Sequence, residues 1–459
     1  MKKLFTFLLF LSPFCLKASH EKGAQVSLRY INTTDMEVRI KLWVDSNGLI
    51  NNSVPYSVQA SGATTSYTAS LSTNVSVGNA TQELSYLDTL QLNATATYKV
   101  VYDVCCRNGI IANLTNASAE NLYTYAELMN NPAQVNSNPE FQNTPMIQMG
   151  VNDTMIHNPM AIDPDGDSLA YYWVNPQGAN GTSIPMTFVA YPNGGWPFWV
   201  DSTTGEITWI PTMTGSYAYA VRVDEYRNGV KIGSSQRDAL VTICVGCKTT
   251  MVSGFEFYNT AAWPKVNNKY QFDLYANTPF NLNLSGGVPM TNNNNLALKM
   301  IGDPNWFANQ PTLNATQTSN NITGTYTWTP TTAQVRNRPY MNVLIGQENS
   351  ASNERKQSER TLLFKVNQQP SGVTLTPEQS LKIYPNPAAS ELMITLDNHQ
   401  GEYTSIAVYS SLGQTMYKKI MQGSSSEAIL LNVADWASGS YFVVLNGQQT
   451  ISRSITVKH

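Results

Sequence analysis

Short runs of alternating apolar and polar residues, separated by turn sequences, constrain the fold of this chain most strongly. Val26, Leu28 and Tyr30 alternate with polar residues, and the run from Tyr98 to Val104 has the same two-residue period. In an extended strand successive side chains point to opposite faces, so this period gives each strand one apolar face. Polar turn sequences such as Asp45–Gly48 separate the runs. The pattern predicts an all-β chain.

Two segments depart from this pattern. Residues 117–129 favour a helix with Ser118 as its N-cap. Residues 130–145 are rich in Asn and Pro, which predicts the boundary of a first domain.

Charge and the N-terminal residues limit the class of protein. Only 13% of residues are charged and the net charge is −3, which disfavours a nucleic-acid partner because phosphate binding needs a basic patch. Two lysines, an apolar run over 4–11 and the small residues Ala18 and Ser19 predict a secretory signal peptide over 1–19. Lipid modification of Cys15 is the less favoured alternative. The rest of the chain has no apolar stretch long enough to cross a bilayer, so no transmembrane segment is expected in the mature protein.

The mature chain has four cysteines, Cys105, Cys106, Cys244 and Cys247. Export through an oxidising compartment favours disulfides. Three pairings remain open: the adjacent pair would close a strained ring, Cys244 and Cys247 would close a short loop, and crossed pairing would clamp two domains together. A zinc site of four thiolates is the less favoured alternative.

The C-terminal residues carry an ordered set of motifs. They begin with Tyr384–Pro387 in a Tyr-Pro-Asn-Pro sequence, continue through Gly413 in a turn and Gly439 and Tyr441 before a strand, and end near Lys458. Together they resemble the C-terminal sorting domain of substrates of the type IX secretion system in Bacteroidetes, from about residue 380 to the end. The resemblance implies a small β-sandwich, the secretion machinery as partner, and release or attachment at the outer cell surface. The sorting residues it points to are Tyr384, Pro385, Asn386, Pro387, Gly413, Gly439, Tyr441 and Lys458.

The first residues of the mature chain carry a second resemblance. The segments 20–24, Val38–Trp43 and Cys105–Gly109 are similar to the opening module of Bacteroidetes surface proteins that often carry gliding-motility-associated sorting modules. This resemblance implies location and architecture, not a mechanism.

An Asp-rich turn precedes a predicted strand in the middle of the chain. Asp163, Asp165 and Asp167 alternate around Gly166. The region resembles cadherin-like and immunoglobulin-like repeats of bacterial surface proteins, and the resemblance implies a calcium site with Asp224 or Glu225 as further ligands. Calcium prefers six to eight oxygen ligands. A plain turn is the alternative, since Asp, Gly and Pro are also what a tight turn requires. Calcium is the one candidate cofactor.

A weak internal repeat divides the middle of the chain. Gly205–Pro211 matches Gly324–Pro330 at Gly, Thr, Trp and Pro, and each Trp is expected in a core. We therefore predict a chain of immunoglobulin-like β-sandwiches with a small C-terminal sorting sandwich. The predicted parts are a signal peptide (1–19), a first domain (20–136), a second domain (137–248), a third domain (249–370), a linker (371–379) and the sorting domain (380–459).

Catalytic motifs are weak in this sequence. His157 has no nucleophile-elbow pattern beside it, and His20 as a copper ligand would need a second histidine that the first domain lacks. Paired carboxylates for glycoside cleavage stay open, although acidic residues are few. Trp196, Trp199, Trp263 and Trp306 are candidates for stacking on sugar rings, with burial in a core as the alternative.

We therefore expect a secreted or outer-surface protein that is not an enzyme and that acts in adhesion or an extracellular matrix. The alternatives are recognition of polysaccharide, chiefly through Trp196 and Trp199, and a cryptic glycan-active hydrolase. The expected partners are the secretion machinery and surface polysaccharide or other surface proteins.

Overall fold

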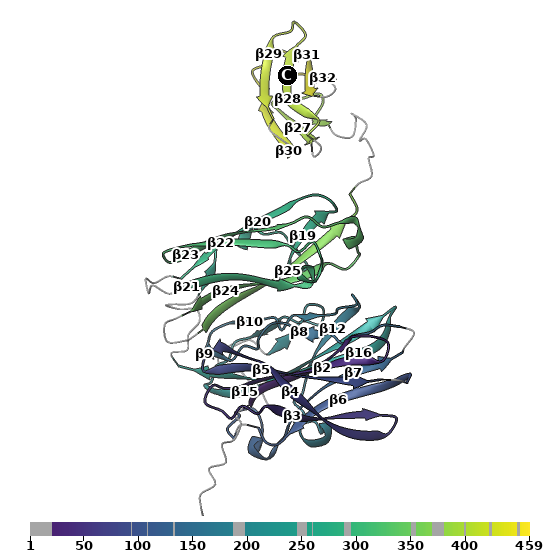
Figure 1. Ribbon diagram of the computed structural model, residues 1–459. Coiled ribbons are helices and arrows are strands. Elements are labelled where there is room, and N and C mark those ends of the chain that lie inside the picture. Colours follow the sequence, from purple (N-terminus) through teal and green to yellow (C-terminus); the bar gives the residue numbers. More distant parts are fainter. Residues whose placement is uncertain are drawn as a thin grey trace, which may run out of the picture. The chain divides into compact units, whose positions relative to one another are not determined.

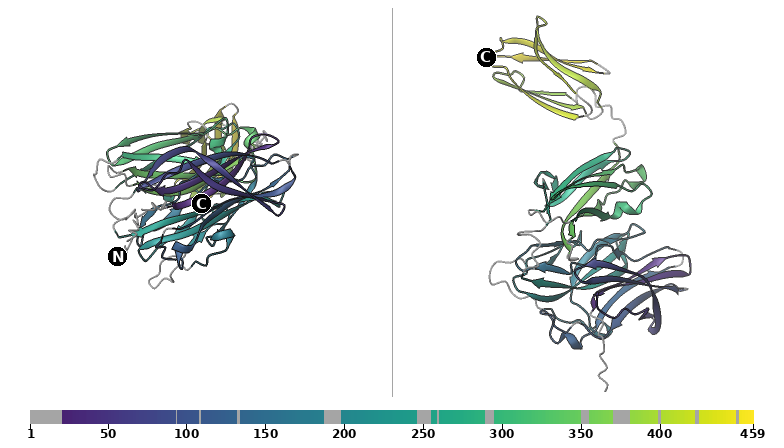
Figure 2. Two further views of the ribbon diagram at one scale, coloured as in Figure 1. Left: turned by 60° about the horizontal axis from the view of Figure 1, so that its bottom comes forward. Right: turned by 60° about the vertical axis from the view of Figure 1, so that its left-hand side comes forward.

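The computed structural model describes residues 21–459 with gaps at 93, 108, 132–133, 187–197, 246–254, 259, 289–294, 350–354, 370–380, 399–400, 422–424 and 448–449. The signal peptide, His20, Trp196 and Cys247 therefore lie outside the described residues, as does the side chain of Trp306. The chain is built from strands and forms two compact units, Met1–Gln368 and Gln369–His459 (Figures 1 and 2). The described part of the chain holds no helix with the length and apolar character needed to span a bilayer.

A large sheet dominates the first unit, with strand order β1-β2-β5-β4-β3-β6-β7-β16-β15-β12. These strands are β1 (Glu21–Tyr30), β2 (Asp35–Asp45), β3 (Ser53–Ala60), β4 (Ala63–Gly78), β5 (Thr81–Gln91), β6 (Ala96–Val104), β7 (Leu122–Asn130), β12 (Ser168–Val174), β15 (Gly215–Arg227) and β16 (Val230–Cys244). Because β1 pairs with both β2 and β16, the strands from β1 to β16 close on themselves around one core. That core includes Val26, Ile40, Tyr86, Val100 and Leu128.

Strand β16 joins the predicted first and second domains. Its residues 233–235 pair with β7 and its residues 237–239 pair with β1, while its other edge pairs with β15. The division of the first 370 residues into three domains stays a prediction, but the 136/137 boundary does not separate two sheets. A fragment that began at residue 137 would lack β1 and β7 and would keep only the short β9 on that edge of β16.

The predicted helix over 117–129 is wrong. This segment contains the short 3-10 helix η1 (Ala117–Ala119) and then β7. Strand β7 pairs with β6 over nine positions, from Ala96↔Asn130 to Val104↔Leu122, and places Leu122, Ala126 and Leu128 in the core. Pairing and burial outweigh a weak local helix preference.

The rest of the predicted second domain packs short strands against the end of the large sheet. These elements are β8 (Glu140–Phe141), β9 (Gln148–Gly150), β10 (Met155–His157), β11 (Ala161–Ile162), η2 (Ala179–Gly181), β13 (Trp199–Val200) and β14 (Ile207–Trp209). Their core includes Trp209, Tyr219 and Val241, and it also takes in Val343 and Ile345 of the third domain. The second and third domains therefore share a hydrophobic core.

The third domain is a β-sandwich of two sheets, ordered β17-β20-β23-β22 and β18-β19-β25-β24-β21. Its elements are β17 (Glu256–Phe257), η3 (Thr260–Ala262), β18 (Lys265–Val266), β19 (Lys269–Tyr275), β20 (Phe280–Gly287), β21 (Asn295–Gly302), η4 (Asp303–Trp306), β22 (Thr312–Thr318), β23 (Asn321–Trp328), η5 (Thr332–Gln334), β24 (Tyr340–Asn349) and β25 (Arg355–Asn367). Trp209 and Trp328, the tryptophans of the two matched segments, are both buried, which confirms that they are core residues.

The second unit is a small sandwich of two sheets, ordered β26-β27-β30 and β29-β28-β31-β32. Its strands are β26 (Leu381–Tyr384), β27 (Glu391–Asn398), β28 (Tyr403–Ser410), β29 (Thr415–Ile420), β30 (Ser425–Asn432), β31 (Gly439–Gly447) and β32 (Ile451–Val457). Ile394 from one sheet and Ile406, Val443 and Ile455 from the other share one core. The predicted all-β fold class is confirmed.

Candidate functional site

Three acidic side chains meet beside the Asp-rich turn. Oxygen atoms of Asp163, Asp167 and Glu225 lie within 4.8 Å of one another, and all three residues are buried. The turn follows β11 and leads into β12, which pairs with β15 so that Leu169 lies opposite Glu225. Gly166 has φ +83°, a left-handed conformation that glycine adopts at little cost, and it lets the turn close. The turn is held by Asp163 Oδ1, which accepts the backbone N–H groups of Asp165 and Asp167 at 2.9 Å each.

Several buried oxygens at this turn have no hydrogen-bond partner among the described residues. They are Asp163 Oδ2, both carboxylate oxygens of Glu225, and Asn138 Oδ1. Asn138 lies near Glu225, and both face Gly233. A Cβ at position 233 would lie 2.5 Å from Glu225 Oε2 and 3.0 Å from Asn138 Nδ2, so only glycine fits between them. Buried charged and polar groups without partners are costly. Carboxylate oxygens are ligands that Ca²⁺ prefers, so Asp163, Asp167 and Glu225 supply donors of the kind that this ion binds.

Burial and mutual repulsion keep these carboxyl groups from ionising easily. Burial raises the pKa of Asp163 to about 7, and the nearby Asp167 and Asp165 carboxylates add to this effect. Burial raises the pKa of Glu225 to about 9, helped by Asp163 and Asp167. A cation placed among them would favour the ionised forms.

The other two predicted ligands lie elsewhere. Asp165 Oδ2 accepts the backbone N–H of Ser137 at 2.6 Å, so its carboxylate ties the turn to the preceding segment. Asp224 pairs with Arg222 and Lys231, because neighbouring residues of a strand point to opposite faces and Glu225 already faces the turn.

Sequence reasoning missed two residues of this site. Arg227 pairs with Asp167 through Nε and NH2, which supplies one positive charge at the margin of the cluster. Asn138 belongs to the Asn- and Pro-rich segment that was interpreted only as a domain boundary. Its Asn-x-Asn-Pro sequence, which spans the boundary between the first and second domains, is the available signal.

Cys105 is joined to its neighbour Cys106 in the structure, and the disulfide pairing of the mature protein stays a prediction. Cys244 is also disulfide-bonded, and Cys247 lies outside the described residues.

His157 is a buried contact residue between the second and third domains. Its Nδ1 lies 2.9 Å from Glu359 Oε1, and neither side chain is more than 1% exposed. Asn143 and Asn158 bind the other oxygen of the same carboxylate. This histidine therefore lies in a structural network.

The candidate sugar-stacking tryptophans have different environments. Trp199 is 60% exposed on β13, and Trp173 on the neighbouring β12 is 45% exposed. Trp263 packs edge-on against Tyr270 and Phe272, which agrees with the core alternative.

The predicted sorting residues are spread over one sandwich. Asn386 Oδ1 accepts the Thr456 backbone N–H at 2.9 Å and so links the Tyr-Pro-Asn-Pro segment to the last strand. Gly413 has φ +81° in the turn between β28 and β29. Tyr441 is buried, and its hydroxyl donates to the Ala437 carbonyl at 2.8 Å. Tyr384, Gly439 and Lys458 are exposed, while Pro385 and Pro387 flank Asn386.

Comparison with known proteins identifies one part of the chain. Residues 382–458 match the family model described as the secretion system C-terminal sorting domain. No curated protein matches the chain.

Solved structures with some likeness include the zebrafish RET cadherin-like domains 1 to 4, at 11% identity and TM-score 0.19, covering 96% of this chain and 97% of that one. They also include the N-terminal eight Ig domains of Down Syndrome Cell Adhesion Molecule, at 10% identity and TM-score 0.17, covering 95% of this chain. The chain spans 49% of that molecule's length. A third is the major pilin subunit of Bacillus cereus, at 9% identity and TM-score 0.15, covering 68% of this chain and 94% of that one.

The C-terminal match agrees in place and order with the motifs from Tyr384 to Lys458 and with the sandwich that they form. This protein carries a type IX secretion system C-terminal sorting domain at residues 382–458 and is exported to the cell surface or secreted.

Proposed function

We propose that this protein is a non-catalytic adhesion or matrix protein of the cell surface, and that a calcium ion stiffens its second domain. The observation that supports this proposal most directly is the buried group Asp163, Asp167 and Glu225, with its unpartnered oxygens. Surface export and an all-β architecture support an adhesion or matrix role.

Bound calcium would tie together three segments that are distant in sequence. Asp163 and Asp167 come from the turn before β12, Glu225 comes from β15, and Asn138 comes from the segment before β8. The same turn also contacts the third domain, because Arg338 NH1 donates to the Asp167 backbone carbonyl at 2.6 Å. An ion that orders this turn would therefore also support the junction between the two domains.

Calcium is expected to raise the melting temperature of the full mature chain relative to chelator. At a free calcium concentration about 100 times the dissociation constant, the folded state gains about 2.7 kcal/mol. Glu225→Gln should remove most of this gain. In chelator the same variant should be at least as stable as the wild type, since it replaces a buried, repelled carboxylate with a neutral amide. Differential scanning calorimetry of both proteins in each condition measures these shifts.

Glu256→Gln is the matched control, because Glu256 is exposed on β17 and outside the cluster. It should respond to calcium as the wild type does. If the melting temperature of the wild type is the same in calcium and in chelator, the Asp-rich turn has no calcium-binding role.

In chelator, the stability of the wild type is expected to fall as pH rises. The folded pKa of Glu225 is raised from 4.5 to about 9, so the folded chain holds a proton that the unfolded chain has released. The stability that this proton gives is complete below about pH 4.5 and is lost as pH rises through the folded value. Melting temperatures across this range should fall more steeply for the wild type than for Glu225→Gln, and saturating calcium should remove the difference. Parallel profiles in chelator would contradict the assignment.

Recognition of polysaccharide is the second candidate, supported by the exposure of Trp199 and Trp173 on neighbouring strands. Exposed aromatic rings offer apolar faces on which sugars stack. Loss of saccharide binding in Trp199→Ala, with binding kept in Arg338→Gln, is the outcome that would favour it.

A further inference from the structure

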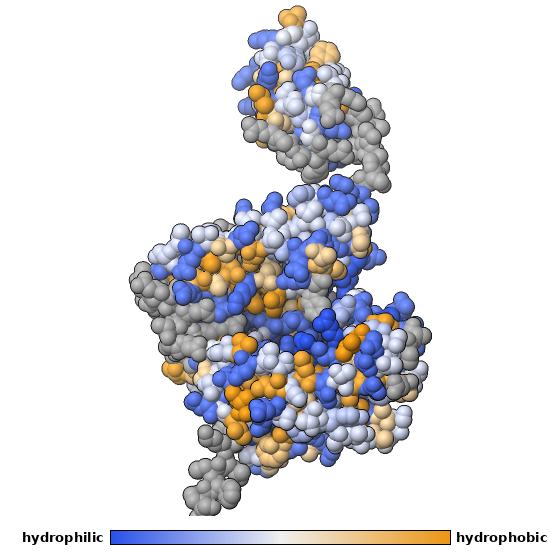
Figure 3. Space-filling view, viewed as in Figure 1, coloured by the Kyte–Doolittle hydropathy of each residue, from blue (hydrophilic) through white to orange (hydrophobic). Residues whose placement is uncertain are grey.

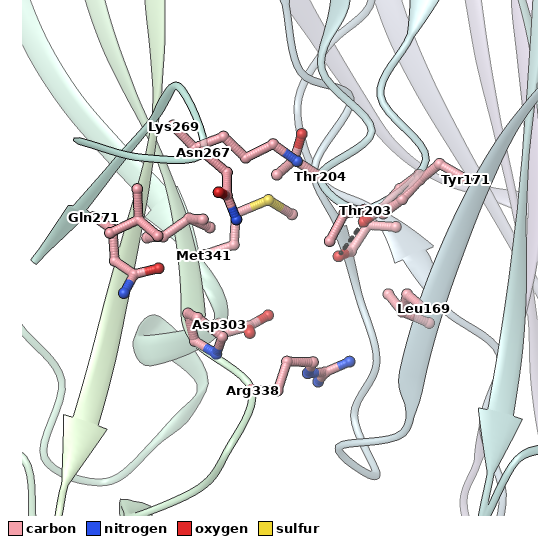
Figure 4. Close-up of a pocket in the computed structure, with 14 residues that line it drawn as sticks. Leu169, Tyr171, Thr203, Thr204, Asn267, Lys269, Gln271, Asp303, Arg338 and Met341 are labelled. Atoms are coloured by element: carbon pink, nitrogen blue, oxygen red, sulfur yellow. Dashed lines mark hydrogen bonds between the residues drawn. The ribbon is translucent and has the colours of Figure 1, made fainter. Parts of the chain in front are cut away.

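A cavity of about 300 Å³ lies within the first unit, between the second and third domains (Figure 4). Leu169 and Tyr171 of β12 and Thr203 of the loop after β13 form one wall. Asn267 and Gln271 on the opposite side come from the third domain. In the space-filling view this face is hollowed between the two domains, and hydrophilic residues border the hollow (Figure 3). Its size is at the lower end of small-molecule sites.

The lining combines apolar surface with groups that both donate and accept hydrogen bonds. Leu169, Met341 and Leu363 supply apolar surface. Asn267 and Gln271 both line the cavity, and an amide offers a donor and an acceptor, with Gln271 Nε2 lying 3.4 Å from Asp273 Oδ1 (Figure 4). This pairing suits a ligand with apolar C–H faces and several hydroxyl groups.

A two-residue turn presents Asn267. Strands β18 and β19 pair so that Val266 lies opposite Lys269, and the turn residues Asn267 and Asn268 have φ +51° and +64°. Two successive left-handed residues are typical of a type I′ hairpin turn, in which Asn is favoured. The backbone at Asn267 is therefore set by the hairpin, and its amide position follows from the strand pairing.

The cavity also holds one positive charge without a counter-charge. Lys269 pairs with Asp201 at 2.8 Å, and Asp303 pairs with Arg336 at 2.6 Å. Arg338 makes no ion pair with any residue that the structure describes. Its NH1 donates to a neutral acceptor, the Asp167 carbonyl, which fixes the guanidinium at the border of the cavity. Among the lining side chains Lys269 and Arg338 are cationic and Asp303 is anionic, so the lining carries a net charge of +1.

We propose that this cleft binds one residue of an acidic saccharide, with the sugar carboxylate on the Arg338 guanidinium. Guanidinium binds carboxylate through paired, charge-assisted hydrogen bonds. The sugar hydroxyl groups bind the amides of Asn267 and Gln271, and one C–H face packs against Leu169 and Met341. A single unpaired cation matches a monoanionic uronate better than a dianionic phosphate. This site uses other side chains than the calcium cluster and Trp199, and it meets the cluster at the Asp167 backbone carbonyl that Arg338 binds.

Isothermal titration of the full mature chain with glucuronate and galacturonate tests the proposal, with glucose and galactose as neutral controls. The uronates should bind with a dissociation constant of about 1 mM or tighter, and the neutral sugars at least tenfold more weakly. Arg338→Gln should weaken uronate binding at least tenfold and leave the neutral sugars unchanged. Arg338→Lys should keep part of the uronate preference, because the charge stays but the fork of donors is lost. Raising the salt concentration should weaken only the uronates.

Asn267→Gly tests the opposite wall, since glycine keeps the left-handed turn and removes the amide. It should weaken the uronates and the neutral sugars alike, by about the same factor. Lys382→Gln removes an exposed cation of the second unit and should change nothing. Melting temperatures of all variants show whether each is folded, and titrations in calcium and in chelator separate this site from the calcium cluster.

Three results would overturn the proposal. The first is no uronate binding at concentrations well above 1 mM, about tenfold or more. The second is unchanged uronate affinity in both Arg338→Gln and Asn267→Gly. The third is binding that is lost in Trp199→Ala but kept in the cleft variants, which would place the saccharide on the exposed tryptophan.

Discussion

Replacing Arg107 with methionine is expected to lower the free energy of unfolding of the first unit by about 3–5 kcal/mol. Arg107 NH1 and NH2 bind Asp238 Oδ1 and Oδ2 at 2.8 and 2.6 Å, and the two side chains are 2% and 0% exposed. Burial raises the pKa of Asp238, and the Arg107 guanidinium lowers it in part. Without the guanidinium, a carboxylate stays in the core with no countercharge.

This ion pair has a large effect because it joins segments that lie far apart in the sequence. Arg107 also donates to the backbone carbonyls of Asn121 and Gln177, and Asp238 lies on β16 where that strand pairs with β1. Arg237, which precedes Asp238 on β16, points to the opposite face of the sheet. It donates to the Gln25 side chain and to the backbone carbonyls of Phe141 and Asn143. Arg237 and Asp238 of β16 therefore bind distant segments of the chain on the two opposite faces of the sheet.

Scanning calorimetry of the full chain measures the loss. The double variant Arg107→Met with Asp238→Leu should recover most of it, because replacing both members of a buried pair with apolar side chains is often close to neutral. Arg39→Met removes a partly exposed cation and should cost no more than about 1 kcal/mol. If Arg107→Met melts like the wild type, the pair does not hold the sheet together.

Glu359→Ala is expected to separate the unfolding of the third domain from that of the rest of the first unit. The Glu359 carboxylate accepts the Asn158 backbone N–H at 2.9 Å and the amides of Asn143 and Gln357 at 3.0 and 2.7 Å, and it lies 2.9 Å from His157 Nδ1. Removing one partner from such a buried network typically costs about 3–5 kcal/mol. Three of these partners belong to the second domain, so the cost falls mainly on the junction.

We expect the first unit of Glu359→Ala to unfold in two calorimetric transitions, and that of the wild type to unfold in one. Glu359→Gln should have a smaller effect, because its amide oxygen still accepts one of these hydrogen bonds. Glu256→Ala, on an exposed strand position, is the control and should leave one transition. A single transition at an unchanged temperature in Glu359→Ala would show that the shared apolar core alone joins the two domains.

The sequence predicts part of the acidic cluster, and its binding of calcium stays a proposal. The sequence pointed to five carboxylates, and the structure brings together Asp163, Asp167 and Glu225. It turns Asp165 toward Ser137 and Asp224 toward Arg222. Whether a turn carboxylate points inward depends on which backbone N–H groups it binds, and a residue's face on a strand depends on its register. Asn138 was missed because only the folded chain brings it beside Glu225.

The sequence by itself determined the all-β class, the sandwich fold of the last unit, and export. These features are encoded locally, in two-residue apolar periods and in motifs from Tyr384 to Lys458 that follow one another along the chain. Only the tertiary structure decided that β16 pairs with β1, that Glu359 joins two domains and that Arg338 faces a cleft. Each of these contacts links residues more than 160 positions apart, such as Gln25 with Arg237. The local sequence pattern does not predict such pairing, because the burial and strand register that select it exist only once the whole core has formed.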